Sequence, residues 1–279
     1  MGRGPELQGA VVAITGAGRG IGRATAKAFA DAGARVGVGD IDETAASATA
    51  QAIGDAAFPC ALDVTDPTSI DAFLEAVSAR FGPVDILVNN AGIMHVGLLA
   101  DEDAAAARRM LDINAEGVRH GMQAALTGMR ARGSGHIVNV ASSAGSIPYP
   151  GGATYSATKA FVLALGTAAR EELIDDGIRV TTVLPGIVRT ELTSGLETPR
   201  FAKAVDAEDV ARAIVGAVQH DRPVVWVPRS LGLAATVFNL LPIRVRRRLT
   251  RTLGADRYLT GQNSAARRDY ERRAAGSTT

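Results

Sequence analysis

The sequence contains only one cysteine in 279 residues, Cys60, so an intramolecular disulfide is excluded. Its first ten residues, MGRGPELQGA, lack the apolar core and cleavage site of a secretory signal. The best candidate for a membrane span, residues 224–241, is interrupted by Pro228 and Arg229. These absences predict a protein of a reducing, cytoplasmic compartment that does not span a membrane.

Aromatic residues are scarce at 4%, and charged residues make up 21% of the chain, whereas hydrophobic residues reach 47%. This composition, rich in Ala and Gly, is typical of a tightly packed α/β protein and excludes a disordered chain. The net charge of +1 is distributed unevenly, because residues 229–279 hold eleven arginines and three acids, a charge of +8, and the rest carries −7. With few aromatics and no matching motif, a nucleic-acid partner is not predicted.

Short apolar runs, many of them β-branched, recur along the chain and are separated mostly by helical segments of ten or more residues, including 21–32 and 110–126. This alternation predicts one parallel sheet with helices on both faces, a doubly wound α/β domain over residues 1–228. The expected strands lie at 10–15, 35–39, 57–62, 86–89, 137–140, 180–184 and 224–227.

Two segments depart from this alternation. Residues 191–206, with Thr, Ser, Gly and Pro, are predicted to form a substrate loop because they follow a strand end, where ligands of such sheets bind. Residues 229–279 are predicted to form a basic, helical C-terminal extension. Its apolar stretch 231–241 is followed by clustered arginines, a pattern that fits contact with an anionic membrane surface. Packing of this stretch over the active site or against a neighbouring subunit, with the arginines in solvent, is favoured over that contact.

A glycine-rich turn, TGAGRGIG at residues 15–22, connects the first strand to the first helix. Glycines let backbone approach a pyrophosphate, whose charge a helix N-terminus favours. The spacing is not the usual GxGxxG, and a purely structural turn stays open.

Asp40 ends the second expected strand, where a carboxylate can accept hydrogen bonds from an adenosine ribose. A 2′-phosphate would meet like charge there, so NAD is favoured over NADP. Arg19, which is able to neutralise such a phosphate, leaves NADP open. The alternative is that Asp40 caps a helix or forms a turn.

From residue 10 to about 190 the sequence resembles the classical short-chain dehydrogenase/reductase family, whose glycine motif is TGxxxGIG. The pair Asp63-Val64, the NNAG element at 89–92 and Pro185-Gly186 with Thr190 match further family elements. The resemblance implies a Rossmann-type fold, and it implies that these residues hold the cofactor: Gly16, Gly18, Arg19, Gly20, Ile21, Gly22, Asp40, Ile41, Asp63, Val64, Asn90, Ala91, Gly92, Tyr155, Lys159, Pro185, Gly186, Val188 and Thr190. For Asn89 and Asn90 a structural role stays open.

The motif Tyr155-Ser-Ala-Thr-Lys159 puts an ammonium and a phenol on one helix face. A neutral tyrosine, with a reference pKa of about 10, is a poor base, and a nearby positive charge favours its phenolate. The resemblance implies that Tyr155 is the general acid/base and that Lys159 also holds the nicotinamide ribose. It implies that Ser142 polarises the substrate oxygen, with Ser143 as the rival hydroxyl, and that Asn114 supports a proton-relaying water.

The expected reaction is hydride transfer between NAD(P) and a secondary alcohol or ketone. Mostly apolar residues around the site favour a hydrophobic substrate of steroid, terpenoid, retinoid or long-chain type, with sugars and acyl thioesters left open. The four histidines show no metal spacing, and no metal is predicted. The candidate substrate residues are Ser142, His95, Tyr149, Leu192, Leu196 and Phe201.

Two other functions stay open. One is a non-redox epimerase or dehydratase, although such relatives usually carry TGxxGxxG. The other is a catalytically idle NAD-binding regulator, although idle members typically lose the Tyr or the Lys. The resemblance also implies a homotetramer or homodimer that forms through the helices holding Asn114 and Tyr155.

Overall fold

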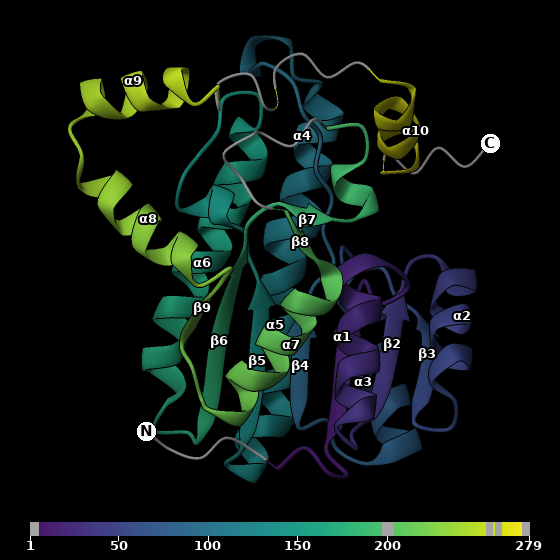
Figure 1. Ribbon diagram of the computed structural model, residues 1–279. Coiled ribbons are helices and arrows are strands. Elements are labelled where there is room, and N and C mark those ends of the chain that lie inside the picture. Colours follow the sequence, from purple (N-terminus) through teal and green to yellow (C-terminus); the bar gives the residue numbers. More distant parts are fainter. Residues whose placement is uncertain (1–5, 197–203, 255–258, 260–263, 275–279) are drawn as a thin grey trace.

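The computed structural model describes residues 6–196, 204–254, 259 and 264–274, and the candidate residue Phe201 lies outside them. One parallel sheet of seven strands forms the centre, in the order β3-β2-β1-β4-β5-β6-β9 (Figure 1). All seven predicted runs are confirmed as strands, with small changes at their ends: β1 Val11–Thr15, β2 Arg35–Asp40, β3 Ala57–Ala61, β4 Ile86–Asn89, β5 Gly135–Val140, β6 Ile178–Pro185 and β9 Val224–Val227.

Helices cover both faces of this sheet, as predicted. Alternate residues of β1 point to opposite faces, so Val12 and Ile14 pack in one core with Phe29, whereas Val11 and Ala13 pack in the other. The first face carries α1 (Gly20–Asp31), α2 (Glu43–Ile53) and α7 (Ala207–Gln219); the second carries α3 (Pro67–Phe81), α5 (Gly117–Arg132) and α6 (Ala153–Leu173).

The strand order reverses beside β1, which pairs with β2 on one side and with β4 on the other. Chain crossovers leave this point in opposite directions, so the carboxyl ends of the strands part there and form a crevice. Ligands of open parallel sheets bind in such a crevice. The fold therefore places the functional site at the carboxyl edge beside β1 and β4.

The segment predicted as one helix over 110–126 is divided. It consists of the end of α4 (Ala104–Leu111), a π-helical turn over Asp112–Glu116 and the start of α5. Such turns are frequent at functional sites because they redirect side chains within a helix. Asn114 lies in this turn.

The predicted substrate loop is bounded by a small sheet that the sequence did not indicate. Its strands, β7 (Val188–Arg189) and β8 (Val205–Asp206), are only two residues long and pair in parallel. A 3₁₀ turn over Glu191–Thr193 follows β7. Two-residue strands carry too little periodicity to be read from a sequence.

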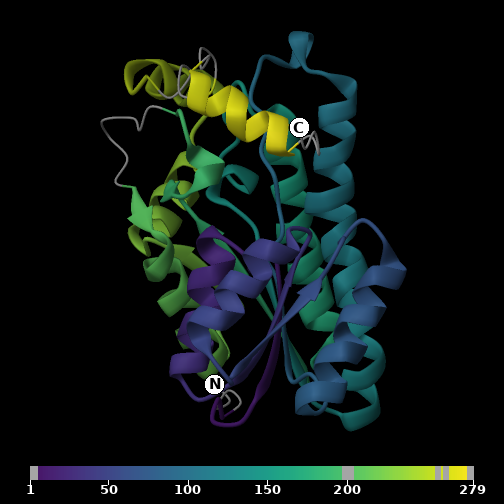
Figure 2. The same cartoon turned by 90° about the vertical axis from the view of Figure 1, so that its right-hand side faces the viewer.

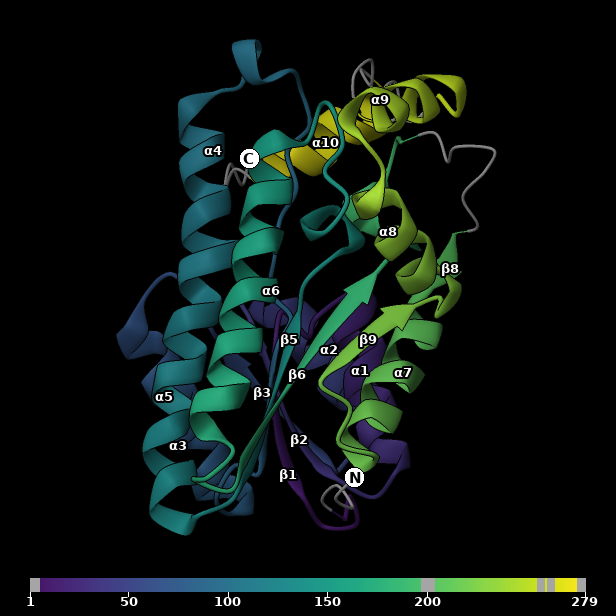
Figure 3. The ribbon, with the colours of Figure 1, turned by 90° about the vertical axis from the view of Figure 1, so that its left-hand side faces the viewer.

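Among the described residues, three helices follow β9: α8 (Ser230–Leu240), α9 (Ile243–Thr252) and α10 (Ala265–Ala274). In Figure 3, α8 and α9 lie on the side of the molecule that carries β9. In Figure 2, α10, yellow, runs across the top of the molecule, above the carboxyl ends of the strands. None of the helices within the described ranges is long and apolar enough to cross a membrane.

Candidate active site

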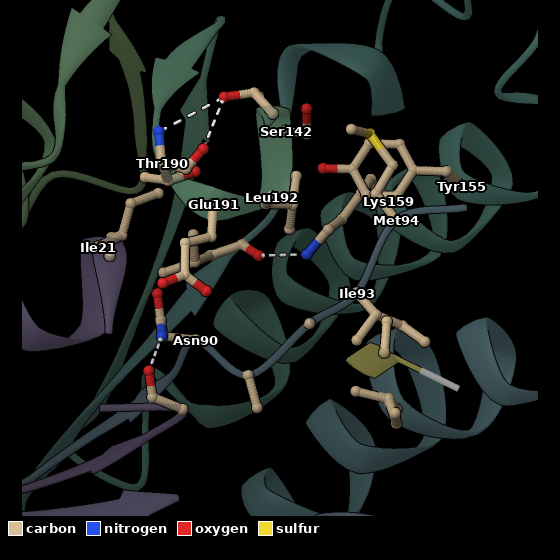
Figure 4. Close-up of a pocket in the computed structure, with 18 of the residues that line it drawn as sticks. Ile21, Asn90, Ile93, Met94, Ser142, Tyr155, Lys159, Thr190, Glu191 and Leu192 are labelled. Carbon is tan, nitrogen blue, oxygen red and sulfur yellow. Dashed lines mark hydrogen bonds between the residues drawn. The ribbon is translucent and has the colours of Figure 1, made fainter. Parts of the chain in front are cut away.

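A cavity of about 760 Å³ lies at the carboxyl edge of the sheet, where the strand order reverses. Figure 4 shows Ser142, Tyr155 and Lys159 among the side chains around it. Most residues predicted for cofactor, catalysis or substrate line this one cavity: Gly16, Arg19, Gly20, Ile21, Asp40, Ile41, Asp63, Val64, Asn90, Ala91, Gly92, Ser142, Tyr149, Tyr155, Lys159, Pro185, Gly186, Val188, Thr190 and Leu192.

Other candidates lie outside the lining. Gly18 borders a neighbouring cavity, and Asn114 is completely buried behind the site. His95 and Leu196, expected at the substrate, are not in the lining either. Burial lowers the pKa of His95. The position of His95 after the NNAG element was too weak a signal to place its ring.

The glycine turn forms a cradle that side chains would fill. A Cβ at Gly16, where φ is +63°, would lie 2.8 Å from the Cα of Ala91, and one at Gly22 would lie 2.1 Å from the carbonyl oxygen of Gly16. No side chain caps the first turn of α1, which begins at this cradle. Uncapped backbone N–H groups at a helix N-terminus favour an anion, so the cradle fits a dinucleotide pyrophosphate.

Asn90 supports this cradle. Its side-chain amide donates hydrogen bonds to the carbonyl oxygens of Thr15 and Gly16, each at 2.9 Å. Asn89 is buried and donates to the side-chain oxygen of Asn139 at 2.9 Å. Asn90 thus holds the backbone of the glycine turn, and Asn89 joins β4 to β5. These contacts are the structural role that the sequence left open.

Asp40 accepts hydrogen bonds from the backbone N–H groups of Gly18, at 2.8 Å, and Asp42, at 3.0 Å. It does not cap α2. The cap is Asp42, which accepts from the N–H of Ala45 at 3.0 Å; that bond is the main reason why the pKa of Asp42 lies below its ordinary value. Asp42 also forms an ion pair with Arg19. The guanidinium that would favour a 2′-phosphate is thus already paired with a carboxylate.

Asn114 fixes the segment that follows the NNAG element. Its side-chain oxygen accepts from the N–H of Ile93 at 2.8 Å, and its nitrogen donates to the Ile93 carbonyl at 2.8 Å and to the Thr158 hydroxyl at 3.2 Å. The π-helical turn directs this amide toward α6, between Ile93 and the helix that carries Lys159.

Lys159 is buried on α6, and its ammonium donates a hydrogen bond to the carbonyl of Val140 at 3.0 Å. Burial lowers the pKa of this lysine to about 8. A Cβ at Gly92 would lie 3.4 Å from the Lys159 nitrogen and 3.2 Å from the Asn114 oxygen, a tight approach. The NNAG glycine therefore leaves room for the lysine and the asparagine.

Tyr155 is 8% exposed and packs in a small apolar cluster with Met94, Met110 and Ala144. The hydroxyl oxygen of Ser142 accepts from the N–H of Ala144 at 3.1 Å, which orients it at the end of β5. The rival hydroxyl, Ser143, also lines the cavity but forms a hydrogen bond with Tyr149, whose pKa burial raises. The cavity thus joins a phenol, an ammonium and a hydroxyl with apolar walls.

Sequence reasoning missed Met94, Leu259 and Tyr270, which also line the cavity. Met94 lies in a loop without periodicity, and the other two follow the sheet by some thirty residues or more, so no local pattern indicated them. Within the described ranges, no group of three or more His, Cys, Asp or Glu side chains is placed to hold a metal ion.

Residues 10–200, about two thirds of the chain, match the sequence profile of the short chain dehydrogenases. The chain belongs to this family. The matched residues contain strands β1 to β6 and most of the cavity lining.

Several curated relatives of the chain are also named as dehydrogenases or oxidoreductases. Sorbitol dehydrogenase of Cereibacter sphaeroides is 42% identical over 208 residues, which cover 74% of this chain and 80% of the relative. The 2,5-dichloro-2,5-cyclohexadiene-1,4-diol dehydrogenase of Sphingobium indicum is 38% identical over 195 residues, 68% of this chain and 78% of the relative. Probable oxidoreductase EphD of Mycobacterium tuberculosis is 38% identical over 237 residues, but this chain spans only 40% of its length.

Among solved structures, a 3-ketoacyl-(acyl-carrier-protein) reductase from Brucella melitensis in complex with NADH is similar, with a TM-score of 0.74 and 31% identity. The match covers 99% of that reductase but only 80% of this chain. About a fifth of this chain therefore has no counterpart in that enzyme.

Proposed function

We propose that this protein transfers a hydride between NAD and a hydrophobic secondary alcohol or ketone, with Tyr155 as the general acid/base. The observation that carries the proposal is the placement of Tyr155, Lys159 and Ser142 around one cavity that also contains the glycine cradle. A nicotinamide bound there supplies or accepts the hydride.

Each side chain has a role that its environment supports. In ketone reduction, the phenol of Tyr155 donates its proton to the carbonyl oxygen, and the Ser142 hydroxyl donates a hydrogen bond to the same oxygen. The ammonium of Lys159 favours the resulting phenolate, because an opposite charge nearby stabilises the charged form. In alcohol oxidation the same proton moves back. Asn114 positions Ile93 and, through Thr158, the helix that carries Lys159.

For the cofactor, the glycine cradle would hold the pyrophosphate, Lys159 the nicotinamide ribose, and Asp40 the adenosine ribose. The carboxylate of Asp40 lines the cavity at the end of β2, and a 2′-phosphate would meet its charge. Arg19, the cation that could offset this repulsion, already forms an ion pair with Asp42. This supports NAD over NADP.

The apolar walls support a hydrophobic substrate. Met94, Tyr149 and Leu192 line the cavity. Met94 is part of the apolar cluster around Tyr155, and Tyr149 and Leu192 pack against that cluster. Cavities of this size take small organic molecules, oriented by a few polar groups. The relatives are named for a polyol, a chlorinated cyclic diol and an acyl thioester, so their names favour no single substrate.

A panel of hydrophobic ketones and alcohols, assayed by nicotinamide absorbance, tests the proposal. We expect turnover with NADH or NAD and at least one hydrophobic member of the panel. Tight cofactor binding without turnover of any member would favour the idle regulator. Conversion of a substrate without net change of the cofactor would favour the epimerase or dehydratase.

We further propose that the protein is a homo-oligomer that forms through the helices near Asn114 and Tyr155. Leu111 on α4 is 42% exposed and Phe161 on α6 is 38% exposed, and burial of such side chains would stabilise a dimer. Light scattering of the wild type and of Phe161→Arg tests this, with a lower mass expected for the variant.

We also propose that α8 and α9 attach the enzyme to an anionic membrane surface. Leu233, Val237 and Leu240 form an apolar stripe on α8, and Leu233 and Leu240 are 73% and 80% exposed. On α9, arginines recur at the spacing of one helix face: Arg244, Arg247, Arg248 and Arg251. Exposed apolar side chains beside arginines match the chemistry of anionic lipid. Such lipid is concentrated in cytoplasmic leaflets, which is the location that the sequence predicts.

A further inference from the structure

The C-terminal segment supplies part of the cavity in which the proposed reaction takes place. Leu259, Tyr270, Arg273 and Ala274 line that cavity, and we call these four residues the outer wall. They lie outside the residues that match the family profile, 10–200. The match to the Brucella reductase likewise covers nearly all of that enzyme but leaves a fifth of this chain unmatched. Nothing in the family match therefore assigns a role to this wall.

The outer wall is attached by Arg267, a residue that is only 1% exposed. Its guanidinium donates hydrogen bonds to the carbonyl oxygen of Leu192 at 2.8 Å and to that of Met94, and it pairs with Glu271 at 2.7 Å. A buried cation with three such partners is costly to remove, because its partners then lose their charge-assisted bonds. One side chain thus joins α10 to both segments that flank the proposed substrate position.

Tyr270 and Glu271 also join α10 to the segment that contains Met94. The Tyr270 hydroxyl accepts a hydrogen bond from the N–H of Met94 at 3.0 Å, and the Glu271 carboxylate accepts one from Val96 at 3.4 Å. The Arg267 guanidinium lies 4.7 Å from the centre of the Tyr270 ring, within the range of a cation–π contact. The side chains of α10 therefore fix the backbone of residues 94–96.

Two glycine contacts show that this packing is close. At Gly195, where φ is +74°, a Cβ would lie 2.8 Å from the backbone nitrogen of Arg267. At Gly151, where φ is +82°, a Cβ would lie 2.6 Å from the backbone of Leu259. One glycine is in the substrate loop and the other precedes α6, which carries Tyr155. At both positions the C-terminal segment lies so close to the glycine that a Cβ atom would clash with it.

We propose that the outer wall sets the size of substrate that the enzyme accepts, with Tyr270 as a specificity-determining residue and Arg267 as a positioning residue. The inference rests on the proposed function for its reaction, a hydride transfer to a hydrophobic ketone. A smaller side chain at position 270 enlarges the cavity, so bulkier ketones find space that the wild type does not offer. Loss of the Arg267 guanidinium frees the loops at 94–96 and 191–196.

The first experiment compares Tyr270→Ala with the wild type on cyclic ketones of increasing size. We expect kcat/KM for the bulkiest ketone, relative to the smallest, to rise about tenfold, the effect of one or two methylene-sized contacts in a pocket. The NADH Kd should change less than about twofold, since the glycine cradle is untouched. An unchanged order of preference with size would overturn the proposal.

The second experiment measures hydrogen exchange in the full-length protein without substrate. Arg267→Ala should accelerate exchange in peptides that cover 94–96 and 191–196 but not in peptides from α3, and Arg267→Lys should restore part of the protection. The matched control is Arg272→Ala, which removes an exposed arginine of the same helix that pairs with the exposed Asp269. Equal exchange in Arg267→Ala and the control would contradict the positioning role.

These readouts separate the outer wall from the reaction. If no ketone is reduced, the proposed function fails, but binding of the same ketones still raises the unfolding temperature of a protein that holds them. In this case the rise in unfolding temperature is compared across ketones of increasing size. If its variation with size differs between Tyr270→Ala and the wild type, the role of the outer wall is supported even without turnover. The same dependence in both proteins would overturn it.

Discussion

The ammonium of Lys159 lies 6.0 Å from the centre of the Tyr155 ring and donates its hydrogen bond to the carbonyl of Val140. The lysine is buried, and desolvation lowers its pKa to about 8. A charge in such surroundings acts strongly on a neighbouring phenol, since little water screens it. The i, i+4 spacing in α6 places the lysine beside the tyrosine, and the packing of α6 on β5 supplies the Val140 carbonyl.

Removal of the phenol oxygen should stop the reaction and spare the fold. Tyr155→Phe keeps the ring that packs on Met94 and Met110 but has no proton to transfer, so we expect kcat to fall by about 10²- to 10⁴-fold. The NADH Kd should stay within a few fold. Steady-state kinetics and fluorescence titration of NADH measure the two effects.

Tyr149→Phe is the matched comparison, because it removes another phenol that lines the same cavity. Its kcat should fall less than about tenfold, since no proton is transferred by that ring. Turnover of Tyr155→Phe at a rate close to that of the wild type would refute the assignment of the general acid/base.

Asp40 should determine the choice of coenzyme. Asp40→Ala removes the carboxylate at the end of β2, and with it the repulsion of a 2′-phosphate. We expect kcat/KM with NADP, relative to NAD, to rise by about tenfold or more. Asp31→Ala, which removes an exposed carboxylate paired with Lys27 on α1, is the control and should leave the ratio unchanged. A constant ratio in Asp40→Ala would argue against the NAD assignment.

The fold could be predicted because its signals are local. Each strand is a short apolar run between polar or glycine residues, and strands that alternate with helices leave a parallel sheet as the simplest arrangement. Tyr155 and Lys159 are four residues apart on one helix, so their proximity followed from helical geometry. The close approach of Gly16 to Ala91 requires a glycine, and the glycine motif in the sequence predicts such a close approach.

The rest of the site depends on contacts between distant segments. The bond from Met94 to Tyr270 joins residues 176 positions apart, and no periodicity links them. The role of Asp42 as the cap of α2 was likewise missed, because Asp40 ends the strand, Asp42 lies two residues later, and only the backbone geometry shows which of them caps the helix. The place of His95 outside the cavity lining could not be predicted for a similar reason, since a side chain in an irregular loop has no face that the sequence defines.

Binding to lipid vesicles should depend on both the charge and the apolar stripe of the C-terminal helices. We expect co-sedimentation of the wild type with anionic vesicles and little with zwitterionic ones. Arg247→Gln with Arg251→Gln should weaken binding by about tenfold or more, since each arginine near the surface contributes about 1 kcal/mol. Leu233→Ser with Leu240→Ser should weaken binding to both kinds of vesicle.

The control for this experiment is Arg212→Gln, an exposed arginine on α7 that pairs with Asp209. It should bind as the wild type does. If the leucine variant instead lowers the mass of the protein in solution and no vesicle binds, the stripe is a contact between two copies of the chain, and the membrane proposal is wrong.

Stability should fall in acid because of His136, which is fully buried on β5 with one ring nitrogen 2.9 Å from the Thr181 hydroxyl. Burial lowers its pKa to about 4 from an ordinary 6.5; Asp221 opposes this shift, and Arg179 and Arg170 add to it. Between these values the unfolded chain binds a proton that the folded protein does not. The free energy of unfolding is therefore not reduced by His136 above pH 6.5. It falls as the pH drops toward 4, by roughly 3 kcal/mol in all.

Urea denaturation at a series of pH values measures this loss. His136→Gln should flatten the dependence between about pH 6 and pH 4.5, where one proton corresponds to about 1.4 kcal/mol per pH unit. The remaining slope comes from groups that both proteins share, which are carboxylates and His95. His220→Gln, at the exposed end of α7, should keep the slope of the wild type. Parallel curves for the wild type and His136→Gln would show that the buried imidazole does not cause the acid sensitivity.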